Sequence, residues 1–269
     1  MSVLSAWIEG ISLFAPGLTG WDASVPLLAG AADLALAPTD IPKLTVLPPA
    51  ERRRVGQVVR LALATGLAAC EAAAADAAEL ATVFASSGGD GANCHAICET
   101  LASSDRLISP IRFHNSVNNA ASGYWGIATG AMAPSAIVSA FDGSFAAGLL
   151  EALCQLAAPT EACERILLIS YDVPYPEPLA AARPMGDACG VGLVLARQPG
   201  PLARARIDVQ VGGFADETRL AGALENVRLG SPSGRALPLL VGLAGGTPAH
   251  CVLTLHEAMT LRVDLAGAS

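Results

Sequence analysis

Short apolar runs alternate along the chain with longer stretches in which apolar positions recur every three or four residues. The short runs are typical of buried strands, and the longer stretches are typical of helices with one apolar face. Regular alternation of the two predicts a layered α/β fold. Strands are predicted at residues 3–13, 82–86, 137–140, 166–170 and 191–195, and helices at 50–75, around 94–101 and at 143–157.

The pattern changes after Arg197. Gln-Pro-Gly-Pro at 198–201 interrupts the chain, and residues 206–211 then alternate polar and apolar side chains, as a half-exposed strand does. We therefore predict two parts, residues 1–197 and a short C-terminal subdomain, 198–269, that completes or caps the fold. In the second part a helix is predicted at about 216–227, with strands at 251–255 and 260–265.

Composition argues against disorder and against a membrane span. Apolar residues make up 52% of the 269 residues and charged residues 15%. The mean hydropathy of +0.49 leaves surplus apolar surface, which a subunit interface would cover. The longest uncharged run, 115–141, contains Asn, Ser, Gly and Pro134, so it predicts no spanning helix.

Cysteine usage and the first residues indicate a cytoplasmic protein. Seven cysteines lie scattered without a framework, which favours reduced thiols. The first eight residues carry no basic side chain before Glu9, which argues against a secretory signal.

The formal net charge of −8 argues against a nucleic-acid partner. The one dense basic cluster is Arg52-Arg53-Arg54, with Arg60 further along. We interpret it as a solvated helix face rather than a phosphate site.

Two motifs suggest chemistry that their surroundings do not support. Cys94, His95 and Cys98 suggest a metal, but a structural zinc site needs four ligands, usually in two pairs. Cys94 and Cys98 also fall on the apolar stripe of a predicted helix, so we expect buried core thiols and no metal site. The glycine-rich run 86–91 lacks the spacing of a nucleotide loop and is expected to be a turn.

Ser144 suggests a serine hydrolase. A nucleophile elbow has glycines two residues on either side of the serine, whereas these positions hold Asp142 and Ala146. A general base would have to be one of three histidines that no motif places near Ser144. These histidines are His114, His250 and His256.

Several short motifs follow in a fixed order between Ser109 and Leu150. A Ser-Pro pair, an Asn-rich stretch and Gly123 precede Ala-Pro-Ser at 133–135, and a buried strand then leads into Phe-Asp-Gly-Ser at 141–144 and an apolar helix. This order resembles the nucleophile region of β-ketoacyl synthases, where the strand ends in Thr-Ala-Cys. A Gly-rich strand at 184–195 resembles a later strand of that family.

The resemblance covers roughly residues 1–197 and fades afterwards. It implies a thiolase-like layered α-β-α fold, with the N-terminal half well matched and the C-terminal part truncated or divergent. It implies no cofactor.

The family's nucleophile is missing. Aligned from Pro134 without a gap, the cysteine position falls on Asp142; aligned on Ser139-Ala140, it falls on Phe141. Neither residue can carry an acyl group as a thioester. We expect Asp142 to cap the following helix instead. The two histidines that promote decarboxylation in the family also have no counterpart motif, so no catalytic residue is predicted.

A cysteine-less ketosynthase-like chain of this kind resembles a chain length factor, the inactive partner of an active β-ketoacyl synthase. The resemblance implies a heterodimer whose acyl tunnel both subunits shape, in polyketide biosynthesis and closest to the aryl polyene pathways of Gram-negative bacteria. It places Ile111, Arg112 and Phe113 at the partner interface beside the acyl tunnel, the alternative being a buried strand edge. Because acyl carrier proteins are acidic, we expect the active partner to receive the carrier, and this chain to meet it indirectly.

Two other functions stay open. One is a self-sufficient acyl-thioester enzyme, an acyltransferase or hydrolase, that uses Asp142, Ser144 or His114. The other is a homodimeric module that binds a lipid or polyene.

Overall fold

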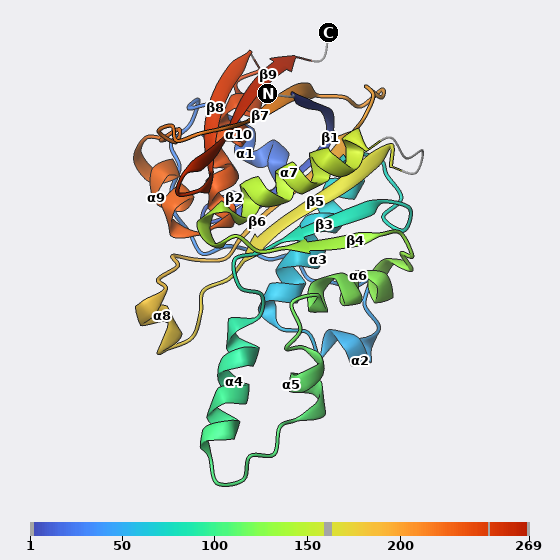
Figure 1. The fold of residues 1–269 in the computed structure, drawn as a ribbon, viewed down its shortest axis with the longest axis vertical. Coiled ribbons are helices and arrows are strands. Elements are labelled where there is room, and N and C mark those ends of the chain that lie inside the picture. Colours follow the sequence, from blue (N-terminus) through green and yellow to red (C-terminus); the bar gives the residue numbers. More distant parts are fainter. Residues whose placement is uncertain (1–2, 159–162, 247, 268–269) are drawn as a thin grey trace.

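The computed structural model describes residues 3–158, 163–246 and 248–267. Within them, nine strands form one mixed sheet in the order β4-β3-β5-β6-β1-β7-β9-β8, with β2 paired to β1 (Figure 1). The strands are β1 (Leu4–Ala15), β2 (Leu18–Thr19), β3 (Ala81–Ala85), β4 (Ser135–Val138), β5 (Arg165–Asp172), β6 (Cys189–Ala196), β7 (Ala205–Gly212), β8 (Ala249–His256) and β9 (Met259–Gly267).

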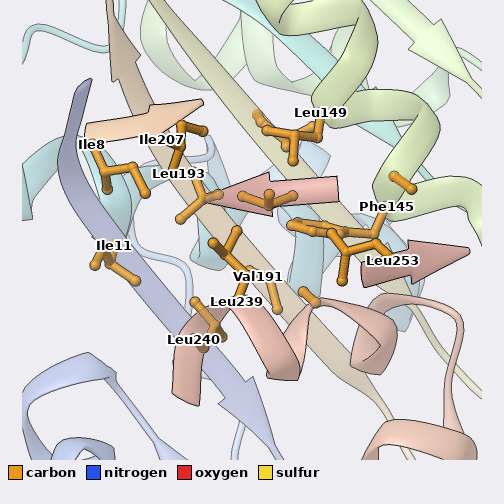
Figure 2. Close-up of a cluster of buried hydrophobic side chains, with 14 of the residues drawn as sticks. Ile8, Ile11, Phe145, Leu149, Val191, Leu193, Ile207, Leu239, Leu240 and Leu253 are labelled. Carbon is orange, nitrogen blue, oxygen red and sulfur yellow. The ribbon is translucent and has the colours of Figure 1, made fainter. Parts of the chain in front are cut away.

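Helices cover both faces of the sheet. Side chains of α3 and α6 form one hydrophobic cluster, and those of α1, α7 and α10 form the other, part of which Figure 2 shows. The helices are α1 (Trp21–Leu28), α2 (Pro49–Arg52), α3 (Gln57–Ala72), α4 (Gly91–Ala102), α5 (Pro110–His114), α6 (Ala120–Thr129), α7 (Ser144–Ala157), α8 (Leu179–Ala182), α9 (Gly222–Gly230) and α10 (Leu237–Ala244), with 3₁₀ turns η1 (Phe141–Gly143) and η2 (Ser233–Ala236).

Strand β5 shows why the central strands read as continuous apolar runs. Ile166 and Leu168 pack into the α7 cluster, whereas Leu167 and Ile169 pack into the α3 cluster. Successive side chains of a strand point to opposite faces, so a strand covered on both sides is apolar at every position. The predicted α-β-α layering is confirmed.

Helix α7 connects β4 to β5, which both run parallel to β3. Parallel strands need such a crossover, and α7 packs closely on the strands beneath it. A Cβ atom at Gly148 would lie 2.7 Å from the Cβ of Ala85 and 2.9 Å from the Cδ1 of Leu168. Glycine at this position allows α7 to approach the sheet.

The second part of the chain continues the same sheet. Strand β1 pairs with β6 on one side and with β7 on the other, and β9 and β8 follow β7. Strands β7, β9 and β8 therefore supply one end of the sheet, and the boundary at 197/198 stays a prediction.

Two predicted helices differ from those observed. The single helix at 50–75 is wrong, because α2 ends at Arg52 and α3 starts at Gln57, with Gly56 in extended conformation between them. The helix at 216–227 is displaced, because residues 216–221 are irregular and α9 runs from 222 to 230.

Replacing the fully buried Leu149 of α7 tests the packing of this layer. Leu149→Ala leaves a cavity and should lower the free energy of unfolding by about 2–5 kcal/mol, measured by urea denaturation. Leu107→Ala is the matched control, because Leu107 is 75% exposed and its truncation should change stability by less than about 0.5 kcal/mol. Equal effects of the two substitutions would contradict the observed burial.

Candidate functional site

The bend between β4 and α7 holds a bulky residue in a strained backbone conformation. Phe141 has φ of 52°, in the left-handed region that aromatic residues rarely adopt, and its side chain is 62% exposed. A Cβ at Gly143 would lie 2.8 Å from the carbonyl carbon of Leu255, so glycine lets β8 pack against the bend. Such strain persists where the surrounding structure holds it, and often at functional sites.

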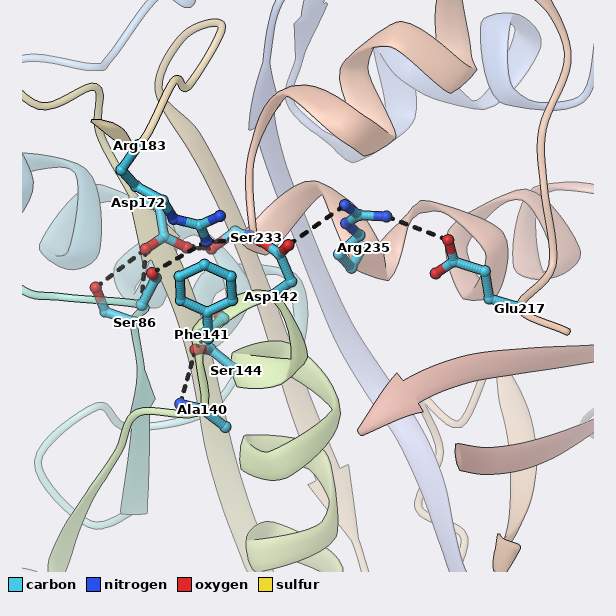
Figure 3. A network of polar contacts seen from close by, with 11 residues as sticks. Ser86, Ala140, Phe141, Asp142, Ser144, Asp172, Arg183, Glu217, Ser233 and Arg235 are labelled. Carbon is cyan, nitrogen blue, oxygen red and sulfur yellow. Dashed lines mark hydrogen bonds and ion pairs between the residues drawn. The ribbon is translucent and has the colours of Figure 1, made fainter. Parts of the chain in front are cut away.

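Two arginines fix Asp142 beside this ring (Figure 3). The guanidinium of Arg183 lies 3.5 Å from the ring centroid of Phe141 and donates to Asp142 Oδ1 over 2.6 Å. Arg235 approaches the other carboxylate oxygen at 3.7 Å. The Asp142 carboxylate therefore faces cations on both sides.

The prediction that Asp142 caps α7 is wrong. Gly143 is the residue before the helix, and no side chain makes a capping hydrogen bond there. The carboxylate is instead oriented toward the guanidinium groups of Arg183 and Arg235, whose full positive charges attract it more strongly than the partial charge at a helix N-terminus.

The ion pairs continue into the C-terminal part of the chain. Arg235 binds Glu217 at 3.3 Å, and Arg228 binds Glu217 at 3.0 Å and Glu225 at 2.7 Å. Arg228 is buried, and its hydrogen bond to Glu225 holds the pKa of that carboxyl at about 2. Burial opposes a similar shift at Glu217, yet hydrogen bonds and charge from Arg228 still lower its pKa.

Ser144 is fully buried, and its hydroxyl group is already engaged. Its Oγ donates to the carbonyl of Phe141 over 2.7 Å and accepts from the amide of Ala140 at 3.0 Å. No histidine in the described part of the chain is hydrogen-bonded to Ser144, and the ring of His114 instead packs edge-on against Tyr124. The serine stabilises the bend in the manner of a local turn.

A second polar group, Asp172, lies buried at the end of β5. Its carboxylate accepts hydrogen bonds from Ser87 N, Ser86 Oγ and both N and Oγ of Ser233. Burial raises the pKa of Asp172 to about 6, and these hydrogen bonds oppose the rise. Asp172 thus joins the loop after β3 to η2, which carries Arg235. Sequence analysis did not identify Asp172, because its hydrogen-bond partners are distant in the sequence and no motif around Asp172 indicates them.

The predicted interface residues lie on a helix at the surface. Ile111 and Phe113 are 46% and 67% exposed on α5, so the alternative of a buried strand edge is wrong. Between α5 and α6 lies an open cavity of about 670 Å³, whose lining includes Phe113, Val117 and Ile127. Ile111 and Arg112 line a second cavity, of about 440 Å³, together with Arg53 and Arg54.

Cys94 and Cys98 correct another expectation. The helix predicted around them forms, but both thiols are exposed rather than buried in a core. The reason is that α4 projects from the body of the molecule beside α5 and does not pack on the sheet (Figure 1).

Within the described ranges, no three His, Cys, Asp or Glu side chains lie close enough together to hold a metal ion. The same residues include no helix long and apolar enough to cross a membrane.

The sequence-family model described as "Beta-ketoacyl synthase, N-terminal domain" matches residues 29–223 of this chain. The chain belongs to this family. No curated protein shows significant sequence similarity to it.

Solved structures of ketosynthases share the fold. A chain in the complex of the ketosynthase ApeO with its chain length factor ApeC from Xenorhabdus doucetiae is 22% identical, with a TM-score of 0.73 over 97% of this chain and 99% of the matched chain. A chain of AntDE:AntF, a type II PKS acyl-carrier protein in complex with its ketosynthase, is 10% identical, with a TM-score of 0.72 over 99% and 100%. The module 1 ketosynthase of the bacillaene synthase from Bacillus amyloliquefaciens FZB42 is 15% identical, with a TM-score of 0.56 over 84% of this chain and 50% of that one. The predicted thiolase-like fold is confirmed.

The carboxyl of Asp172 should make stability depend on pH. Its pKa is raised from 3.8 to about 6, so the folded chain holds this proton more tightly than the unfolded chain does. The resulting stabilisation is full below pH 3.8 and is lost as the pH rises through about 6. The free energy of unfolding should therefore fall between pH 4 and 7 more steeply in the wild type than in Asp172→Asn, as measured by urea denaturation across that range. Parallel pH profiles would contradict the assignment.

Proposed function

We propose that this chain is a non-catalytic chain length factor that pairs with an active β-ketoacyl synthase and shapes the acyl tunnel of the pair. The observation that carries the proposal is the bend before α7, where no side chain is placed to accept an acyl group. Phe141 has no nucleophilic atom, Asp142 is held between Arg183 and Arg235, and the hydroxyl of Ser144 is buried and engaged. Covalent catalysis needs a free, activated nucleophile.

Of the two residues at the nucleophile position, the geometry favours Phe141. Its ring projects outward from the strained tip of the bend, whereas the Asp142 carboxylate turns toward two arginines (Figure 3). An outward-facing side chain at a strand-to-helix turn is the one that an incoming acyl group would meet. Here it would meet an aromatic ring beneath a guanidinium group.

Two surface features support a protein partner. Within the part of the chain that the structure describes, β4 pairs with β3 alone, so its other edge ends the sheet, and an open edge is able to pair with a strand of another chain. Exposed apolar side chains on α5 and α6 border the neighbouring cavity. A monomer seldom exposes such a group of apolar side chains, and an interface would cover it.

The matched structures also support a partner subunit. This chain aligns with almost the whole of the matched chains in the ApeO–ApeC and AntDE:AntF complexes and with half of the bacillaene synthase ketosynthase. The decarboxylation histidines of the family have no counterpart motif in these residues. In the proposed pair, the other subunit would supply them.

In the pair, we place Ile111, Arg112 and Phe113 at the interface beside the acyl tunnel. Their exposure on a short helix suits side chains that reach into a neighbour. An aryl polyene or a related polyketide is the product class that we propose, and the cytoplasm is the proposed compartment.

Co-expression tests the function. The chain should co-purify one-to-one with a candidate β-ketoacyl synthase, and the pair should condense malonyl and acyl thioesters, while the purified chain alone should show no turnover. Native mass spectrometry measures the pairing, and product analysis measures the condensation. Turnover by the chain alone would favour a self-sufficient enzyme, and a stable homodimer that ignores the synthase would favour a binding module; either result contradicts the proposal.

Phe113→Asp should weaken pairing with the synthase by about thirtyfold or more, because it would place an unpaired charge in an apolar contact. The matched control is Leu202→Asp, since Leu202 is 45% exposed and lies next to β7, away from α5. Analytical ultracentrifugation of the mixed subunits gives the dissociation constants. If the two variants pair equally well, α5 does not belong to the interface.

A further inference from the structure

A cavity of about 370 Å³ lies among three segments that are far apart in the sequence. We call it the α9 cavity, because α9 and the residues that follow it form one wall. Its lining includes residues 36–38 of the irregular segment after α1, Gly186 and Asp187 of the loop before β6, and Val227 and Ser231 at the α9 wall. None of the lining residues that the structure describes belongs to the bend, to α5 or to α6.

Hydrogen bonds between the three segments hold these walls in place. The amide of Gly186 donates to the carbonyl of Gly230 over 2.7 Å, which joins the loop to the end of α9. Thr39 joins the loop to the segment after α1, because its amide donates to Asp187 Oδ2 over 2.8 Å and its hydroxyl to the carbonyl of Ala188 over 2.7 Å. A site whose walls are already ordered loses little free energy through ordering when a ligand binds.

Most of the lining is apolar. The walls are formed mainly by Pro16, Leu36, Ala37, Pro38 and the buried Val227. Apolar walls favour a ligand with a hydrocarbon body, since the contact removes apolar surface of both from water. Small-molecule sites usually enclose about 300–1,000 Å³, so the volume of the α9 cavity suits a small ligand.

A buried hydroxyl group in the lining lacks a strong hydrogen-bond partner. Ser231 is 4% exposed. Its hydroxyl interacts with the buried thiol of Cys189, and it forms no other hydrogen bond within the described residues. A thiol is a weak hydrogen-bonding group, and a buried hydroxyl without a good partner costs free energy. A ligand with its own hydroxyl group would supply that partner.

The charge at the α9 cavity disfavours an anionic ligand. Asp187 is in the lining, and the described lining residues include no Lys, Arg or His. Both carboxylate oxygens of Asp187 accept backbone hydrogen bonds, one from Thr39 and the other from Ala188, so the carboxylate is fixed in place. A carboxylate or phosphate on the ligand would meet this like charge without a cation to offset it.

The α9 cavity also adjoins the segments that support the bend. Arg183 lies three positions before Gly186, and Arg235 lies four positions after Ser231. These two arginines hold the Asp142 carboxylate. A molecule in the α9 cavity would therefore contact both of the segments on which the geometry of the bend depends.

We propose that the α9 cavity binds a small neutral molecule, an alkyl or aryl chain that ends in a hydroxyl group. The chain would lie against Pro16, Leu36 and Val227, and its hydroxyl group would form a hydrogen bond with Ser231. The site stands on the shape and chemistry of this cavity, and it does not depend on how the chain pairs with another subunit.

Titration of the full-length chain with 1-octanol and with octanoate tests the proposal. The two probes have chains of equal length and differ in the charge of the end group. Octanol should bind about tenfold or more tightly than octanoate, because of the Asp187 carboxylate. Amide-resolved NMR gives the dissociation constants and shows where each probe binds, and the octanol shifts should centre on residues 36–39, 186–188 and 226–231.

Ala37→Trp should fill the α9 cavity and weaken octanol binding about tenfold or more. Ala37 is exposed, so the larger side chain can be accommodated without disturbing the core. Ala102→Trp is the matched control, because Ala102 is an exposed alanine at the end of α4, and it should leave the dissociation constant unchanged. Circular dichroism checks that both variants fold.

Asp187→Asn tests the charge separately. It should tighten octanoate binding about threefold or more and change octanol binding by less than about twofold, because it removes the like charge and keeps an oxygen that can accept from Thr39.

Three results would each overturn the proposal: octanoate binding as tight as octanol binding, equal octanol affinities of Ala37→Trp and Ala102→Trp, or octanol shifts confined to α5 and α6. The absence of octanol binding up to the solubility limit would overturn it as well.

Discussion

The ion pairs that run from Arg183 through Asp142 to Arg235 determine what the bend before α7 presents to its surroundings. They occupy the carboxylate, lay a guanidinium over the ring of Phe141 and connect the bend to Glu217 and Arg228 in the C-terminal part. Removing one partner of such a partly buried network leaves an uncompensated charge, which is costly. The strained backbone at Phe141 is held by this network from one side and by the packing of β8 against Gly143 from the other.

Much of the fold could be predicted from local pattern. Strands β5 and β6 read as apolar runs because both faces of the sheet are covered, and α7 showed an apolar run of helical length. The break between α2 and α3 escaped prediction, since the apolar spacing continues across it and the extended conformation of Gly56 is set by its surroundings. The stripe of Cys94 and Cys98 was misread, because periodicity shows that a helix has an apolar face but not that anything covers it.

The site was less accessible to sequence reasoning. The pattern narrowed the nucleophile position to Phe141 or Asp142, but an alignment cannot show which side chain faces outward. The two arginines that orient the Asp142 carboxylate, Arg183 and Arg235, lie 41 and 93 positions beyond it in the sequence. Asp172 was missed for the same reason, because its hydrogen-bond donors Ser86 and Ser233 are distant in the sequence and meet only in the folded chain. Ion pairs and hydrogen bonds between residues so far apart in the sequence leave no periodic pattern of residue types that could predict them.

The proposed function would give the chain a role without a nucleophile. The open edge of β4, with the apolar side chains of α5 and α6, suits the partner subunit that we propose. In that pair the chain would contribute shape to a reaction whose bond-making groups belong to its partner.

If the chain itself never carries the acyl group, peptide mapping of the purified chain after exposure to an acyl thioester should detect no acylation. Tryptic cleavage after Arg112 and Arg165 releases residues 113–165, a single peptide that contains His114, Asp142 and Ser144. Tandem mass spectrometry should find these three side chains unmodified. An acyl group on any of them, lost on further incubation with turnover of the thioester, would contradict it.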